Sequence, residues 1–153
     1  PISALDASAQ AQIANLLHDL AKRLDVGLLF ISHDLAIVRH IADVVTVMYL
    51  GKVAEFGPTP AVWDTPMHPY SDALIGAVLH ADGSADMPEA LPGDVPDPAD
   101  PPPGCRFNTR CPRVMEVCRH QKPPYFYLDE DHQVACFLYD QTLDQQKEET
   151  PSI

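Results

Sequence analysis

A histidine stands between a hydroxyl and a carboxylate at the end of a short apolar run. The run covers residues 28–31 and leads directly into Ser32, His33 and Asp34. An unbroken apolar run of this length is typical of a strand buried on both faces of a parallel sheet. Because ligands bind outside the carboxyl ends of such strands, the position of His33 predicts a site there. A histidine in an ordinary polar loop is the alternative that the residues leave open.

Four cysteines form a second group with chemical potential: Cys105, Cys111, Cys118 and Cys136. They lack the close C-x-x-C pairs of zinc ribbons and bacterial ferredoxins, so their spacing identifies no metal. Disulfides would need an oxidising compartment, and the chain begins with no export signal. All the cysteines of the chain nevertheless fall in one short segment. A metal site, free thiols and disulfides remain the alternatives.

Two helices are expected around the histidine. Apolar residues recur at helical spacing over residues 8–24, and a second, shorter helix is expected over residues 35–41. The carboxylate of Asp34 is placed to cap the second helix. The sequence therefore predicts helix, buried strand and helix, with His33 where the strand ends.

A strand pair and two helical segments follow. Residues 43–49 and 52–56 are rich in β-branched residues and predict two strands joined by a tight turn. A helical turn is expected over residues 61–63 and a helix over residues 69–79. Core packing is the expected role of Met48, Trp63 and Tyr70.

Composition restricts the class of protein. With 153 residues and 46% hydrophobic content, the chain has room for one domain, or for a piece of a domain with a small appendix. Its 22 acidic and 10 basic residues give a net charge of −12, which disfavours nucleic acid and anionic lipid as partners. No apolar stretch approaches the ~20 residues that span a bilayer. We expect a soluble, unexported chain and, because it begins at Pro1 without methionine, a fragment of a longer protein.

The proline content changes sharply along the chain. Residues 81–103 contain seven of the 16 prolines and no lysine or arginine, which predicts an extended linker. Residues 104–139 hold the cysteines, and residues 140–153 form a polar tail that we expect to be frayed.

The segment from Ser3 to Asp34 resembles the C-terminal portion of the nucleotide-binding subunit of an ABC transporter. By this resemblance His33 is the switch histidine, which contacts the γ-phosphate of ATP. An imidazole suits that role because phosphoryl transfer is catalysed mainly by donors placed on developing phosphate charge. The resemblance also implies that the D-loop, which lies across the interface of two such subunits, consists of Ser3, Ala4, Leu5 and Asp6.

The implied fold class is α/β. Residues 1–80 would be the C-terminal part of a P-loop NTPase domain of the ABC type. Residues 81–103 would be a linker, residues 104–139 a small four-cysteine C-terminal domain, and residues 140–153 a disordered tail.

Further motifs resemble the oligopeptide and dipeptide branch of these ATPases. They include Glu55-Phe56-Gly57 and the run from Pro66 to Tyr70, which contains His68-Pro69-Tyr70. His68 itself is expected to be structural, because Pro69 suits it to starting a helix. The resemblance implies a [4Fe-4S] cluster on the four cysteines, whose charge nearby arginines could offset; zinc, free thiols and disulfides remain alternatives. Asn108-Thr109 departs from the His-Pro of many relatives.

The resemblance implies a fragment of the ATP-hydrolysing subunit of a peptide importer. Such a subunit uses ATP with Mg²⁺ and dimerises with a second ATP-binding subunit. It drives two transmembrane permease subunits and serves a substrate-binding protein indirectly, at the cytoplasmic face of the inner membrane. Because the chain contains no Walker A loop, signature motif or Walker B strand, we expect it to be inactive alone. The alternative is a non-catalytic metal-binding regulatory module that retains half a nucleotide-binding domain.

Overall fold

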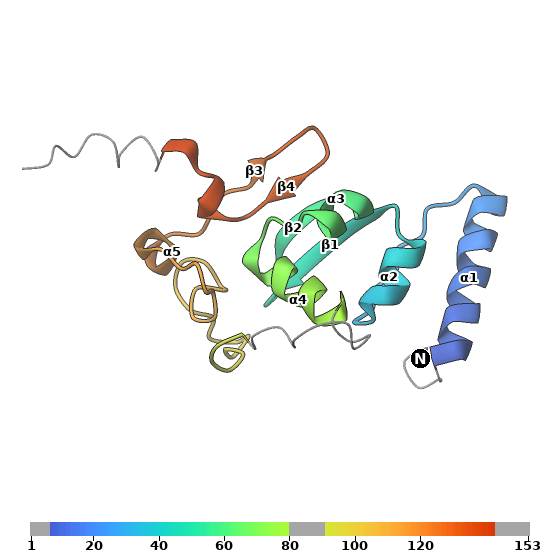
Figure 1. Cartoon of the computed structure of the whole chain (residues 1–153), viewed down its shortest axis with the longest axis horizontal. Coiled ribbons are helices and arrows are strands. Elements are labelled where there is room, and N and C mark those ends of the chain that lie inside the picture. Colours follow the sequence, from blue (N-terminus) through green and yellow to red (C-terminus); the bar gives the residue numbers. More distant parts are fainter. Residues whose placement is uncertain (1–6, 80–90, 143–153) are drawn as a thin grey trace, which may run out of the picture. The chain divides into compact units, whose positions relative to one another are not determined.

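The chain divides into two compact units, Pro1–Asp43 and Val44–Ile153. The structure, a computed structural model, describes residues 7–79 and 91–142 (Figure 1). No helix within these ranges is both long enough and apolar enough to cross a membrane.

The first unit contains two helices, as the apolar spacing predicts. They are α1 (Ala7–Leu24) and α2 (Leu35–Ile41). Ala14 of α1 and Ile41 of α2 are buried, and His40 Nε2 lies 2.8 Å from Asn15 Oδ1, which links the helices through a hydrogen bond. The small side chain of Ala14 suits a position covered by a second helix.

The buried strand expected over residues 28–31 is absent, and this prediction was wrong. These residues have no regular structure, and the side chains of Leu29 and Ile31 are 87% and 89% exposed. A strand of a parallel sheet needs neighbouring strands to pair with its backbone and to bury its side chains. The described residues of the first unit supply no such neighbour, so the apolar run lies in an open connection.

An antiparallel sheet organises the second unit. Its strand order is β1-β2-β4-β3, with bounds β1 (Val44–Tyr49), β2 (Lys52–Pro58), β4 (Gln133–Val134) and β3 (Phe126–Tyr127). The expected strand pair is confirmed as β1 and β2. Leu50 and Gly51 join these strands with positive φ values of 45° and 73°, which suits the right-handed twist of a hairpin.

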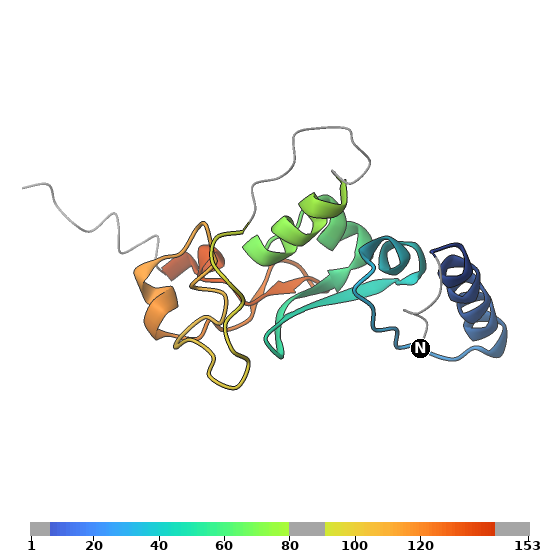
Figure 2. The ribbon, with the colours of Figure 1, turned by 90° about the horizontal axis from the view of Figure 1, so that it is seen from below.

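Two helices lie together on one side of the β1–β2 pair (Figures 1 and 2). They are α3 (Thr59–Asp64) and α4 (Pro69–Leu79). Trp63 of α3 is buried, as expected. Met48 is 55% exposed, so its expected core role was wrong. Side chains alternate across a strand, and Met48 faces away from the side on which Val45 and Tyr49 are buried.

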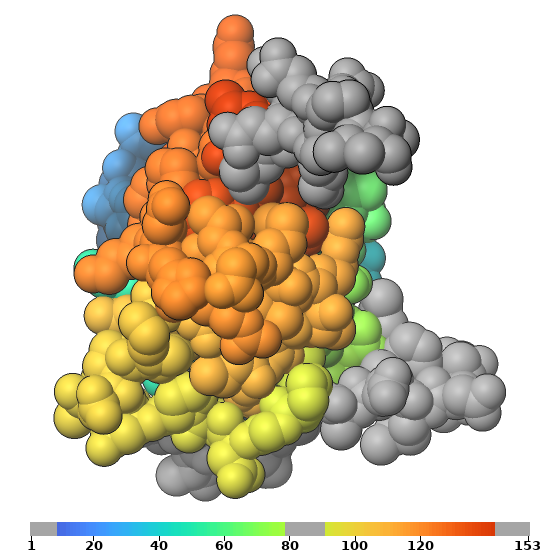
Figure 3. Space-filling model, turned by 90° about the vertical axis from the view of Figure 1, so that its left-hand side faces the viewer, coloured from blue at the N-terminus to red at the C-terminus, as the bar shows by residue number. Residues whose placement is uncertain are grey.

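The cysteine segment folds as part of the second unit (Figure 3). It contains α5 (Glu116–His120) and a short 3₁₀ helix, Phe137–Tyr139, and its strand β4 pairs with β2. The compact units therefore divide at Asp43, whereas the sequence divided the chain around residues 81–103. Residues 91–103 contain no helix or strand, in keeping with the proline content, and residues 80–90 lie outside the described ranges.

Gly104 occupies a position that only glycine can take without strain. Its φ is +73°, and an added Cβ would lie 2.3 Å from the carbonyl oxygen of Cys118. That carbonyl also accepts a hydrogen bond of 2.8 Å from the Cys105 amide, so it is held in place. The backbone of the first cysteine thus packs directly on the backbone of the third.

We predict that Gly104→Ala destabilises the protein by at least about 2 kcal/mol, because both the backbone conformation and the contact forbid a side chain. Urea unfolding followed by circular dichroism measures the change. Gly76→Ala is the matched control, since a Cβ at Gly76 within α4 meets nothing within 4 Å. Equal stability of the two variants would contradict the prediction.

Candidate functional site

The backbone around His33 is fixed by side-chain caps. Asp34 Oδ1 accepts hydrogen bonds from the amides of Ala36 and Ile37 at 3.0 and 3.2 Å, which confirms Asp34 as the cap of α2. Ser32 Oγ accepts a bond of 3.0 Å from the Asp34 amide. The His33 side chain itself is exposed. Its two neighbours therefore hold the loop while the imidazole faces outward.

The predicted D-loop lies outside the described residues. The position of Ser3, Ala4, Leu5 and Asp6 relative to His33 therefore stays a prediction.

The four cysteines are free thiols gathered in one region of the second unit. Cys118 and Cys136 are buried, whereas Cys105 and Cys111 are half-buried. Burial raises the pKa of Cys136 to about 12, and the charges of the other three thiols act in the same direction. Burial likewise raises the pKa of Cys105 and of Cys111. These raised pKa values keep the thiols of Cys105, Cys111 and Cys136 protonated at neutral pH when no cation is bound.

Thiolates are ligands of both zinc and iron–sulfur clusters, so the thiol chemistry alone does not choose between them. Within residues 7–79 and 91–142, no three Cys, His, Asp or Glu side chains are arranged to hold a metal ion. A metal or cluster on the four cysteines therefore stays a prediction.

A buried carboxylate joins β2, the start of α4 and β4; from the sequence it was named only as part of a family motif and given no role. Glu55 of β2 is fully buried. Its Oε1 accepts a bond of 3.0 Å from the Met67 amide, and its Oε2 accepts one of 2.9 Å from the His68 amide. His132 Nε2 lies 2.8 Å from Oε1, and its side chain is also buried. Three donors from two distant segments thus satisfy one carboxylate.

The position of the His132 ring beside Glu55 depends on its close approach to Gly57. An added Cβ on Gly57 would lie 2.8 Å from the His132 ring, so only a residue without a side chain leaves room for that imidazole. The one clue in the sequence is an acidic residue inside an apolar strand, followed two residues later by glycine. Nothing local marks His132, because its partner lies 77 residues away.

His68 caps α4, which agrees with the structural role expected for it. Its Nδ1 accepts a hydrogen bond of 3.0 Å from the Tyr70 amide, so that nitrogen carries no proton. Burial lowers the pKa of His68 from 6.5 to about 4, although the nearby Glu55 charge acts in the opposite direction. At neutral pH the ring is therefore uncharged.

An aromatic group connects this cap to the cysteine loop. The Tyr49 ring lies 4.7 Å from that of Tyr70 and 5.1 Å from that of Phe107, both edge-on, and Phe107 lies 5.7 Å from the His68 ring. Phe107 follows Cys105 by two residues and is almost fully buried. The hydroxyl of Tyr139 also donates a bond of 2.9 Å to the Met67 carbonyl. Both ends of the cysteine segment therefore pack against the start of α4.

Known proteins share this arrangement of motifs. Residues 54–118, which include Glu55, His68 and the first three cysteines, match the family model for the oligopeptide/dipeptide transporter C-terminal region. The chain is 47% identical over 138 residues, 90% of its length, to a probable peptide ABC transporter ATP-binding protein, y4tS, of Sinorhizobium fredii, and covers 39% of that protein.

Two further relatives give the same result. The oligopeptide transport ATP-binding protein AppF of Bacillus subtilis is 46% identical over 91% of this chain and 43% of its own length. For OppF of Haemophilus influenzae, which carries the same description, the values are 48%, 89% and 42%. The chain thus spans less than half the length of these relatives.

Over about nine-tenths of its length the chain is therefore similar to the ATP-binding subunits of ABC transporters. The match of residues 54–118 is to the oligopeptide/dipeptide branch of that class, as the His68-Pro69-Tyr70 motif predicted.

The lowered pKa of His68 predicts a pH-dependent stability. Between pH 6.5 and about 4 the unfolded chain binds a proton that the folded chain does not, so stability falls as the pH falls through this window. The loss contributed by His68 at pH 4 is about 3 kcal/mol. Urea unfolding at pH 7 and pH 5, between which about 2 kcal/mol of this loss is expected, tests it. His68→Asn is the comparison, because asparagine also accepts the cap bond without titrating. An equal pH dependence in both proteins would contradict this prediction.

Proposed function

We propose that the parent protein of this chain is the ATP-hydrolysing subunit of an oligopeptide or dipeptide importer. The observation that carries the proposal is the match over about nine-tenths of the chain to peptide transport ATP-binding proteins. The parent would use ATP with Mg²⁺, pair with a second ATP-binding subunit and drive two transmembrane permeases. A substrate-binding protein would deliver the peptide on the other side, and the subunit would lie at the cytoplasmic face of the inner membrane.

We assign the γ-phosphate contact to His33. The rigid caps at Ser32 and Asp34 leave the imidazole outside the helix and free to donate to a phosphate oxygen. The D-loop residues Ser3, Ala4, Leu5 and Asp6 would reach across the dimer interface. The chain alone carries no phosphate-binding loop, so His33 would act only in the complete subunit.

His33→Ala, made in the protein extended by its upstream sequence, should lower the rate of ATP hydrolysis at least about 100-fold, because a donor to developing phosphate charge is lost. ATP binding should change much less. Phosphate release under saturating ATP gives the rate, and His120→Ala, an exposed histidine of the cysteine segment, is the matched control. Unchanged turnover in His33→Ala would remove the switch role.

For the cysteine segment we propose a [4Fe-4S] cluster on Cys105, Cys111, Cys118 and Cys136. The gathered thiols support it, as does the tight packing of the Cys105 and Cys118 backbones. Nearby arginines would offset the cluster's negative charge. The cluster would stabilise this segment, since none of the residues in it resembles a catalytic base or nucleophile.

Protein purified without oxygen should then be brown and contain about four iron and four sulfide per chain. Cys136→Ser should lose most of the iron, because one of the four thiolates is missing. The chain offers no fifth cysteine as a control, so Ser71→Ala, at a buried hydroxyl of α4, tests whether mutation of a buried residue is itself disruptive. Colourless protein that contains zinc would favour a zinc site in place of the cluster, and metal-free protein would favour free thiols.

The alternative function is a non-catalytic metal-binding regulatory module. It is favoured only by the compactness of the second unit, in which the cysteine segment shares a sheet with β2. The upstream reading frame separates the two functions, since the ATPase requires a phosphate-binding loop and a signature motif there.

A further inference from the structure

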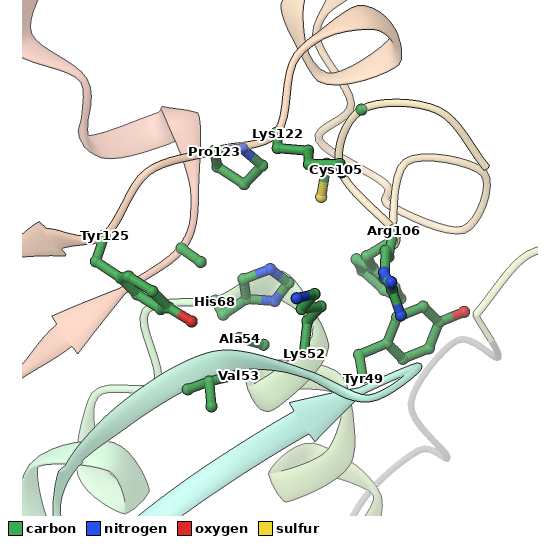
Figure 4. Close-up of a pocket in the computed structure, with 13 residues that line it drawn as sticks. Tyr49, Lys52, Val53, Ala54, His68, Cys105, Arg106, Lys122, Pro123 and Tyr125 are labelled. Carbon is green, nitrogen blue, oxygen red and sulfur yellow. The ribbon is translucent and has the colours of Figure 1, made fainter. Parts of the chain in front are cut away.

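A cavity of about 230 Å³ opens in the second unit between β2, the loop after Gly104 and the segment that leads to β3 (Figure 4). We propose that this cavity binds a small organic anion with a compact apolar body. The cavity belongs to the second unit, whereas His33 belongs to the first, and the proposal does not depend on the proposed ATPase function.

Positive charge converges on the cavity. Lys52, Arg106 and Lys122 all line it, and none of the lining residues is acidic. These are three of only ten basic residues in a chain with 22 acidic ones. Within the described ranges none of the three forms an ion pair. Like charges brought together repel one another, so an anion bound among the three cations would remove an unfavourable interaction.

One of the cations is already held in place. The Arg106 guanidinium donates a hydrogen bond to the carbonyl of Leu50 in the β1–β2 turn. An anchored guanidinium loses less freedom when it binds an anion than a free side chain does. Lys52, at the start of β2, reaches toward the same open space, and Lys122 approaches it from the opposite wall (Figure 4).

The remaining lining restricts the rest of the ligand. Apolar or aromatic walls come from Val53, Phe107, Pro123 and Tyr125, and the half-buried thiol of Cys105 also lines the cavity. His68, which also faces the cavity, is uncharged at neutral pH and adds no further charge. Because no carboxylate lines the cavity, an ammonium group would find no partner there, which disfavours amino acids and peptides.

The volume of the cavity suits a small ligand. A water molecule takes about 30 Å³ in the liquid, so the cavity holds roughly seven or eight waters, or a molecule of about ten non-hydrogen atoms. A phosphate or carboxylate on one small ring fits that volume, whereas a nucleoside triphosphate does not.

The test uses the 153-residue chain with phenyl phosphate and benzoate, which separate the two anionic groups, and with phenol as the uncharged ring. Titrations followed by amide NMR should shift the signals of Lys52, Arg106 and Lys122 with at least one of the two anions. Affinity should fall with added salt. The double variant Lys52→Gln/Lys122→Gln should bind about tenfold or more weakly, because two charged partners are lost. Lys22→Gln/Arg23→Gln on α1 removes the same charge elsewhere and should bind normally.

Three results would overturn the proposal. Binding of phenol as tight as that of both anions would show that charge is irrelevant. Equal weakening in the two double variants would show that only net charge matters. Absence of binding to either anion, in protein prepared with and without iron, would mean that the cations serve only the charge balance of the cysteine segment.

Discussion

The second unit depends on the buried carboxylate of Glu55. Removing a carboxylate from water costs several kcal/mol unless other groups replace the lost hydrogen bonds. Here the replacements are two backbone amides, of Met67 and His68, and the imidazole of His132. Since an unpaired buried charge is so unfavourable, these donors must all be in place at once. One side chain therefore fixes β2, the start of α4 and the hairpin of β3 and β4 against one another.

A series of contacts runs from Glu55 to the cysteine loop. The His68 amide is held by the carboxylate, and its ring then caps α4 through the Tyr70 amide. Tyr70 and Tyr49 pack on Phe107, which lies within the first cysteine loop. The His68-Pro69-Tyr70 motif therefore contacts the β1–β2 strand pair on one side and the cysteine segment on the other. This contact agrees with the occurrence of the motif and the first three cysteines in one family region, residues 54–118.

Local sequence patterns predicted the elements whose stabilising contacts come from residues close in the sequence. The helices α1, α2 and α4, the β1–β2 hairpin and the Asp34 cap all depend on residues within one or two turns. Prediction failed where partners are distant or absent. The apolar run at residues 28–31 has the composition of a strand, yet pairing is a property of its neighbours. The contact of Glu55 with His132 left no local signal, because a 77-residue separation has no periodicity to detect. For the same reason the sequence treated the cysteine segment as separate from the sheet to which β4 belongs.

The two units differ in how completely their large apolar side chains are buried, and this difference affects the proposed role of His33. The second unit covers Val62, Phe107 and Val134 almost completely. In the first unit Leu16, Leu29 and Ile31 are each more than 60% exposed. Large apolar side chains left exposed in this way are typical of a surface that another protein surface covers. The run that carries His33 would become a strand only when such a surface pairs with it and buries it. The backbone next to His33 is fixed by its capping neighbours. The distance from its imidazole to a bound phosphate is not fixed, because the run that precedes it is unpaired. The proposed role of His33 therefore requires the rest of the nucleotide-binding domain, whereas the contacts around Glu55 and the cysteines are complete within the second unit.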